Sequence, residues 1–161
     1  MILQISPMFV KNDGGREAMG RKGKAGDCAV RAIAIATGKP YQEVYDDLFS
    51  ANKSSPRHGG TSTKTIHKYL TSLGWSWFPT MQIGSGCKVH LRRDELPGGN
   101  IIVRLSGHLC AVIDGVINDT YDPSRGGTRC VYGYWSQTKP MCNGDRAAID
   151  LSLAVQRDSV Q

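Results

Sequence analysis

Two side chains in this sequence have the residue types and the chain order of a thiol–imidazole pair. Cys28 follows a Gly-Asp dipeptide at the start of a predicted helix, and His108 follows a Ser-Gly dipeptide at the start of a predicted strand. The unpaired N–H groups and partial positive charge of a helix N-terminus favour a thiolate, which makes the sulfur a nucleophile. The same N–H groups can stabilise an oxyanion on a substrate carbonyl. Each residue alone is also typical of a structural role, the cysteine as a buried core thiol.

An Asp-Gly dipeptide at residues 114–115 predicts a two-residue hairpin turn, and this turn selects a third residue. Counting outward from the turn places Asp119 diagonal to His108 on the same face of the sheet. A carboxylate there would fix the tautomer of the imidazole and stabilise the imidazolium. A register slip of one residue or a bulge would select Asn118 or Asp122 instead. For Asp119 itself, the alternative is a solvated carboxylate at the end of a strand.

These residues need a buried helix and a sheet to position them, and the hydrophobic patterns predict both. Residues 29–36 are apolar except for Arg31, and Gly38 supplies a C-terminal stop, which predicts a central helix with Asp27 as its N-cap. Amphipathic periodicity predicts two more helices, at residues 40–49 and 62–73. Short apolar runs then predict strands at residues 75–78, 101–105, 108–113, 116–121 and 129–135. Helices followed by strands indicate an α+β fold with an antiparallel sheet.

The length and composition fit a single domain. The chain has 161 residues, 40% of them hydrophobic, which suits one core but not two. We place the domain at residues 26–161 and treat residues 1–25 as a basic, Gly-rich lead-in whose apolar start can form a strand. No apolar run reaches the ~20 residues that span a bilayer, and the N-terminus lacks the pattern of a secretory signal. We therefore expect no membrane partner and a cytoplasmic location.

The cysteines do not have the spacing of a disulfide framework. They lie at positions 28, 87, 110, 130 and 142, an odd number that a reducing cytoplasm would keep as free thiols. Cys87 and His90 have the spacing of some zinc ligands, but no second pair completes a tetrahedron. We expect neither a metal nor a cofactor. Cys110 can line a cleft beside His108, although a buried strand thiol is the favoured interpretation.

The net charge of +6 comes largely from basic residues between Lys11 and Lys24. Such a segment can bind an acidic partner, and a solvated arm is the favoured alternative. Aromatic residues make up only 7% of the chain and do not alternate with the basic ones. A stacking platform for single-stranded nucleic acid is therefore not expected.

The segments GDCAVRAIAIATGKPYQEVYDDL and GHLCAVIDGVINDTYDPSRGG resemble papain-like cysteine peptidase-fold proteins, especially small members encoded by bacteriophages and bacteria. The resemblance covers roughly residues 26–123. It implies a papain-like fold with Cys28 as nucleophile, His108 as general base and acid, and Asp119 as the residue that orients His108. The Asp-Pro dipeptide at 122–123 also resembles the one that follows the catalytic strand of bacteriocin-leader peptidases, which would favour Asp122.

The chain departs from this family at one position. Papain-like peptidases carry a glutamine shortly before the cysteine, where it completes the oxyanion hole, and here that position is Lys22. Lys24, Asn12 or backbone N–H groups can supply a donor instead. Loss of one such donor costs other enzymes ~100- to 1,000-fold in rate, so the departure bears on catalytic efficiency more than on the fold.

The residues and the resemblance together predict a cysteine hydrolase that cleaves an amide or isopeptide bond in a peptide or protein substrate. One alternative is acyl transfer to an amine, as in transglutaminase-like relatives. The other is a non-catalytic binding module, such as a phage protein that blocks a host factor in the host cytoplasm. A fold by itself does not choose among these functions.

Overall fold

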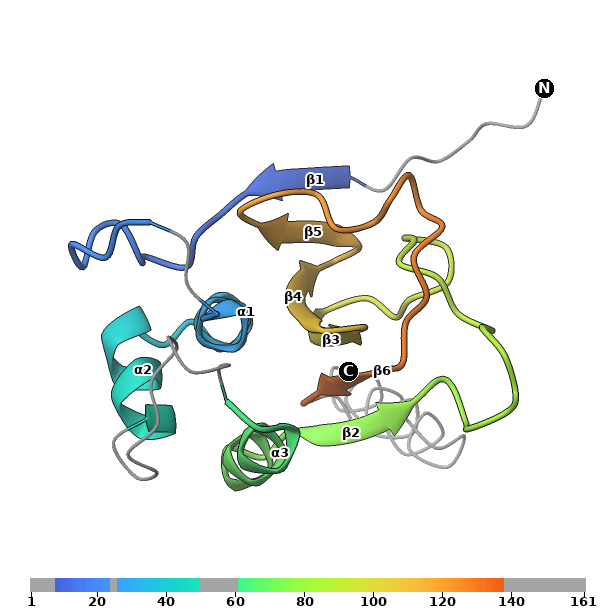
Figure 1. Cartoon of the computed structure of the whole chain (residues 1–161), viewed down its shortest axis with the longest axis horizontal. Helices are drawn as coiled ribbons and strands as arrows, with labels where there is room; N and C mark the ends of the chain where they lie inside the picture. The colour runs from blue at the N-terminus through green and yellow to red at the C-terminus, as the bar shows by residue number, and fades with distance from the viewer. Residues whose placement is uncertain (1–7, 24–25, 50–60, 138–161) are drawn as a thin grey trace, which may run out of the picture.

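The structure is a computed structural model that describes residues 8–23, 26–49 and 61–137. These residues form an α+β domain in which three helices lie along one side of a six-stranded sheet that curves around the first helix (Figure 1). No helix in these ranges is both long enough and apolar enough to cross a membrane.

The central helix is α1 (Cys28–Thr37), as its apolar sequence predicts. Residues 29–34 and Ala36 are buried, and the helix packs against β4 (His108–Ile113), β3 (Asn100–Leu105) and α2 (Tyr41–Phe49). Gly38 ends α1 with a φ of 74°, a conformation that residues with a Cβ rarely adopt. The third helix, α3 (Thr63–Ser72), begins after Ser62, whose hydroxyl accepts a hydrogen bond from a backbone N–H.

Asp27 stands at the N-cap position of α1, but its side chain does not cap the helix. Its carboxylate instead accepts a hydrogen bond from Tyr41 Oη at 2.7 Å and forms ion pairs with Arg16, at 2.8 Å, and with Arg31. The prediction that the Asp27 side chain caps α1 is therefore wrong, because the carboxylate oxygens bind two guanidinium groups and a phenol instead. Bonds between ionised groups are stronger than a bond to a neutral N–H.

The strand order across the sheet is β1-β5-β4-β3-β6-β2. In chain order the strands are β1 (Met8–Lys11), β2 (Ser76–Pro79), β3 (Asn100–Leu105), β4 (His108–Ile113), β5 (Val116–Asp119) and β6 (Gly133–Ser136). Neighbouring strands are antiparallel except β1 and β5, which are parallel. The sheet is therefore mixed, and the expectation of an antiparallel sheet is wrong at this edge. The three helices lie between β1 and the other strands in the sequence, and such a long connection permits parallel pairing.

The segment before residue 26 belongs to the same folded unit as the rest of the described chain. β1 pairs with β5 along its whole length. Arg16 reaches the buried Asp27, and the Arg21 guanidinium lies 3.6 Å from the centre of the Tyr45 ring. Residues 8–23 are thus packed together with the domain, whose start the sequence placed at residue 26.

Both faces of the sheet are covered by apolar side chains. On the helix side, Ile102 and Trp135 of the sheet pack against the buried residues of the helices. On the other side, Ile101, Val103 and Ile117 form a second cluster with residues of the connections between strands. Figure 1 shows the chain between β2 and β3 and the chain between β5 and β6 running along this second side. The alternation of side chains along β3 explains why one strand contributes to both clusters.

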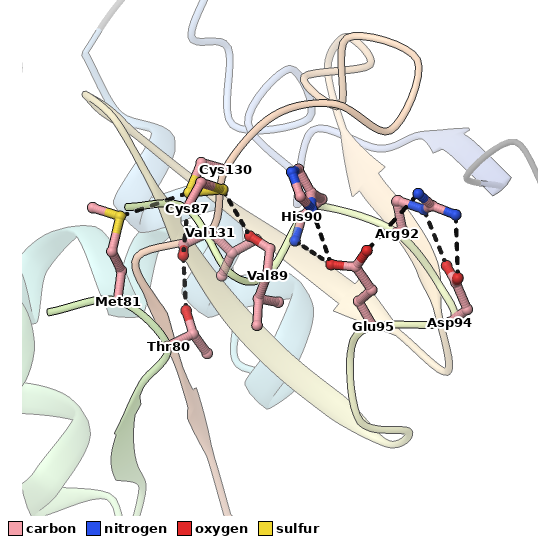
Figure 2. Close-up of polar contacts among 10 residues, drawn as sticks. All are labelled: Thr80, Met81, Cys87, Val89, His90, Arg92, Asp94, Glu95, Cys130 and Val131. Carbon is pink, nitrogen blue, oxygen red and sulfur yellow. Dashed lines mark hydrogen bonds and ion pairs between the residues drawn. A yellow bond between two sulfur atoms is a disulfide. The ribbon is translucent and has the colours of Figure 1, made fainter. Parts of the chain in front are cut away.

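The second side also holds a disulfide. Cys87 and Cys130 are joined with their Cα atoms 5.8 Å apart (Figure 2), next to a β-bridge between His90 and Cys130. The expectation that the cysteines are free thiols is wrong for this pair, because a long-range bridge brings together residues that are 43 positions apart. Cys28 and Cys110 are free, and Cys142 lies outside the described residues.

In this region the two residues that have the spacing of zinc ligands each have another partner. Cys87 is held in the disulfide, and His90 Nδ1 lies 3.1 Å from Glu95 Oε2 (Figure 2). In the described ranges, no three His, Cys, Asp or Glu side chains are grouped so that they could hold a metal ion.

Candidate active site

A cleft with a volume of about 260 Å³ lies where the start of α1, the start of α3 and the turn between β3 and β4 meet. Cys28, Ile66, Arg104, His108 and Leu109 are among the residues that form its wall. The two residues of the predicted thiol–imidazole pair, 80 positions apart in the chain, therefore open into the same cavity.

Cys28 is the first residue of α1 and is partly exposed to the cleft. Its sulfur accepts hydrogen bonds from the His108 side chain and from the backbone N–H of Leu109. Burial raises the pKa of the thiol, but these hydrogen bonds and the positive charges of His108 and Arg31 outweigh it, so the net pKa lies below the ordinary value. The thiolate is the favoured form of a cysteine in these surroundings.

His108 is the first residue of β4 and follows a two-residue turn in which Gly107 has a φ of 64°. Its Nε2 lies 2.6 Å from Asp119 Oδ2, and its ring contacts the Tyr121 ring in a tilted arrangement with 5.3 Å between the centroids. Since Nε2 is occupied by Asp119, Nδ1 is the ring nitrogen left for Cys28.

The surroundings of His108 favour the protonated form of its ring. Burial lowers its pKa, but the hydrogen bonds and charges of Asp119 and Cys28 raise it to about 9. A thiol with a lowered pKa and an imidazole with a raised pKa favour transfer of the proton from sulfur to nitrogen, which gives a thiolate–imidazolium pair. This pair is the chemically reactive state of a cysteine nucleophile.

Asp119 is the third member of the group, as the hairpin count predicted. Residues 114 and 115 form the turn with positive φ values of 48° and 81°, and the register pairs Ile113 with Val116 and Ala111 with Asn118. This register brings Asp119 to His108. The carboxylate is buried, with 3% of its side chain exposed, and its second oxygen accepts the Thr120 N–H at 2.7 Å.

The two alternative residues lie elsewhere. Asn118 Oδ1 accepts a hydrogen bond from Nδ2 of Asn12, the residue that follows β1, at 3.2 Å. Asp122 is exposed, and its carboxylate accepts the backbone N–H of Ser124 at 2.9 Å in a local turn. Neither the register slip nor the Asp122 alternative suggested by the resemblance is seen.

Arg31 links the group to the centre of the domain, and sequence reasoning assigned it no role. One guanidinium nitrogen pairs with Asp27, and the other lies 3.6 Å from Asp119 Oδ1. Charges of opposite sign thus alternate from Arg16 through Asp27, Arg31 and Asp119 to His108. The only signal in the sequence was a single charge within an otherwise apolar helix, which indicates a buried partner but does not identify it.

Lys22, one of the two lysines expected near the oxyanion, does not line the cleft. Lys22 is exposed, and its carbonyl accepts a hydrogen bond from Arg16 at 3.3 Å. Lys24 lies outside the described residues, and Asn12 bonds to Asn118 and to Gly14 N. The first hydrogen bond of α1 is donated by the Arg31 N–H, so the Cys28 N–H precedes it and is free to point at a substrate oxygen.

Cys110 does not belong to the site. It is buried in the second apolar cluster, and burial raises the pKa of its thiol. It is the buried strand thiol that was the favoured interpretation.

The geometry therefore places a cysteine, a histidine and a carboxylate in a row beside a small cleft, and the pKa shifts of the first two favour the thiolate and the imidazolium. Such a row can form and break an acyl–sulfur bond, since it holds a nucleophile, a proton donor and a group that orients the donor. Compared with protein-family models, with curated proteins and with solved structures, the chain has no match.

Proposed function

We propose that this protein is a cysteine hydrolase of papain-like type that cleaves an amide or isopeptide bond in a peptide or protein. The observation that carries the proposal is the position of His108, whose ring contacts the Cys28 sulfur and the Asp119 carboxylate at the same time. Cys28 at the start of a buried helix and His108 on an adjacent sheet also fit the papain-like resemblance.

The first half of the reaction forms an acyl-enzyme. The Cys28 thiolate attacks the carbonyl carbon, and the resulting oxyanion is stabilised by the Cys28 N–H and the positive end of α1. His108 Nδ1–H then gives its proton to the leaving nitrogen, the C–N bond breaks, and an amine leaves. Cys28 is left as a thioester and His108 as a neutral imidazole hydrogen-bonded to Asp119.

The second half hydrolyses the thioester. A water molecule attacks the acyl carbon while His108 takes one of its protons. The C–S bond breaks, the acid product leaves, and the thiolate–imidazolium pair is restored. Asp119 stays ionised throughout and keeps the ring in the orientation in which Nδ1 faces the sulfur.

The proposal is tested by acylation of the intact protein with p-nitrophenyl acetate, an activated ester that any acyl-forming thiolate attacks. We expect a burst of p-nitrophenolate and an acetyl group on Cys28 by peptide mass spectrometry, followed by slow turnover. The burst should be absent from Cys28→Ser and slowed at least tenfold in His108→Ala, in line with the ~10²- to 10⁴-fold worth of a positioned acid or base.

Cys110→Ser is the matched control, because Cys110 is the other free thiol in the described part of the chain and lies in the core. Its burst should equal that of the wild type. A burst in Cys28→Ser that matches the wild type would contradict the proposal. Acetyl-Cys28 that is released only when an amine such as glycinamide is added would instead favour the acyl-transfer alternative. No acylation despite a folded protein would favour a binding module.

A further inference from the structure

The cleft contains a positive charge that the proposed reaction does not use. Arg104 lies on β3, a strand with a neighbour on each side. It forms part of the cleft wall together with Cys28 and His108. Ile102 of the same strand packs on the helix side of the sheet, whereas Val103 packs on the other side. Alternation therefore directs the Arg104 side chain to the side on which Cys28 lies.

The Arg104 guanidinium has no ion-pair or hydrogen-bond partner among the residues that the structure describes. Arg16 and Arg31 have a buried carboxylate, and Arg92 pairs with Asp94 on the surface. Arg104 is half-buried in the cleft, and the guanidinium group of arginine is always charged in proteins. Its five donors are thus available to a molecule that enters the cleft.

The other groups of the cleft do not neutralise this charge. Cys28 and His108 together carry no net negative charge whether their shared proton lies on sulfur or on nitrogen, and none of the residues that line the cleft is acidic. The hydroxyl oxygen of Thr61, also in the wall, is buried without a hydrogen-bond partner among the described residues. The cleft therefore offers a net positive charge and a spare hydroxyl beside the nucleophile.

The size of the cleft limits what can carry the complementary charge. About 260 Å³ is below the ~300–1,000 Å³ of pockets for drug-sized ligands, so the cleft takes a short piece of a chain. In a peptide the anionic group of that size is a carboxylate. The planar fork of arginine binds carboxylates through two parallel hydrogen bonds.

We infer that Arg104 binds a carboxylate of the substrate, so that the enzyme cleaves peptides that carry an acidic group close to the scissile bond. This inference rests on the proposed function and names the substrate class for it. In a peptide this carboxylate belongs either to an acidic side chain or to a free C-terminus, and both groups have the same chemistry.

A pair of alkylating reagents tests the subsite at Cys28 itself. Iodoacetate and iodoacetamide react with the same thiolate by the same displacement of iodide and differ only in a carboxylate against a neutral amide. The quantity measured is the ratio of their rates at Cys28, followed by peptide mass spectrometry in the wild type and in Arg104→Gln. We expect Arg104→Gln to lower the ratio about tenfold or more, as the loss of a charge-assisted hydrogen bond requires.

Arg125→Gln is the matched control, because it removes the same charge from an exposed position that does not line the cleft. Its rate ratio should equal that of the wild type. A ratio that Arg104→Gln leaves unchanged, or that Arg125→Gln lowers as much, would overturn the subsite. Slow reaction of Cys28 with both reagents would contradict the proposed function instead, while the ratio would still report on Arg104.

Three short peptides then separate the two sources of the carboxylate. We would measure how well Gly-Glu-Gly amide, Gly-Gln-Gly with a free C-terminus and Gly-Gln-Gly amide protect Cys28 from iodoacetamide. Better protection by the first identifies an acidic side chain, and by the second a C-terminal carboxylate. In either case the advantage over the neutral peptide should disappear in Arg104→Gln. Equal protection by all three peptides would overturn the inference.

Discussion

His108 shows how much one ring depends on its two partners. Its Nε2 is held by Asp119, and its other side contacts the Cys28 thiol. The two negative partners overcome the effect of burial and raise the pKa of the ring to about 9. The thiolate–imidazolium pair should therefore exist from the lowered pKa of Cys28 up to about pH 9, where the ring loses its proton.

Replacing Asp119 by asparagine should narrow this pH window. Without the carboxylate charge, the pKa of His108 falls from about 9 towards its ordinary value, so the ring is neutral over the alkaline part of the window. The pKa of Cys28 then rises, because it loses the positive charge of its partner. We expect alkylation of Cys28 by iodoacetamide near neutral pH to slow about tenfold for each unit of that rise.

The measurement is the rate of alkylation across about pH 5 to 9 in the presence of a free-thiol standard. Asp122→Asn is the matched control, since Asp122 is exposed and bonds only within its own turn. Its profile should overlay that of the wild type. If both variants changed the profile equally, Asp119 would have no special role in the charge state of His108.

At the scale of elements, the site exists because one helix is fixed against the sheet by charge as well as by packing. The buried face of α1 places Cys28 beside the start of β4. Arg31, one turn further along, pairs with Asp27 at the start of the same helix and with Asp119 at the end of β5. The two contacts tie the helix start to the strand that carries the third member of the site.

Arg31→Met should therefore destabilise the domain and the site together. It leaves the carboxylates of Asp27 and Asp119 buried with one positive partner fewer, which typically costs about 3 kcal/mol. We expect the midpoint of urea unfolding to fall by a corresponding amount, with an unchanged slope. The alkylation of Cys28 should also slow, because the Arg31 charge contributes to its lowered pKa.

Glu43→Gln provides the control at the same spacing. Lys39 and Glu43 form an ion pair four residues apart on the surface, as Asp27 and Arg31 do in the interior. Exposed pairs contribute little to stability, so the unfolding midpoint should stay at the wild-type value. Equal losses in the two variants would show that burial of the Arg31 pair is not what stabilises α1.

At the scale of the whole molecule, the far side of the sheet is covered by long connections, and the disulfide joins two of them. Cys87 lies between β2 and β3, and Cys130 lies between β5 and β6 (Figure 2). Neither residue lines the cleft on the helix side. Disulfides are rare in a reducing cytoplasm, so the Cys87–Cys130 disulfide favours an oxidising compartment, whereas the sequence predicts a cytoplasmic location.

The double variant Cys87→Ser/Cys130→Ser should lose stability but keep the reactivity of Cys28. Releasing a loop of 43 residues raises the entropy of the unfolded chain and costs about 4 kcal/mol in the chain-entropy treatment. We expect a lower unfolding midpoint by urea and an unchanged rate of Cys28 alkylation. Dithiothreitol should lower the wild-type midpoint to that of the variant and leave the variant unaffected. A midpoint that is insensitive to both changes would contradict a stabilising disulfide.

Local features of the sequence were enough for much of the site. The start of α1 at Cys28 follows from an apolar run after Gly-Asp, and the hairpin register follows from Asp-Gly, because both depend on residues that are neighbours in the chain. The choice of Asp119 over Asn118 and Asp122 was a consequence of that register. The sequence also predicted the other helices and the strands of the hairpins within a few residues.

Only the tertiary structure decided the long-range contacts. The parallel pairing of β1 with β5, the disulfide between Cys87 and Cys130 and the contact of Arg31 with Asp119 each join residues that are far apart in the chain. Periodicity assigns a side chain to one face of a strand, but it does not say what lies opposite that face. For this reason the sequence by itself predicted that Cys28, His108 and Asp119 lie together, whereas the charge of Arg104 inside their cleft became visible only in the folded chain.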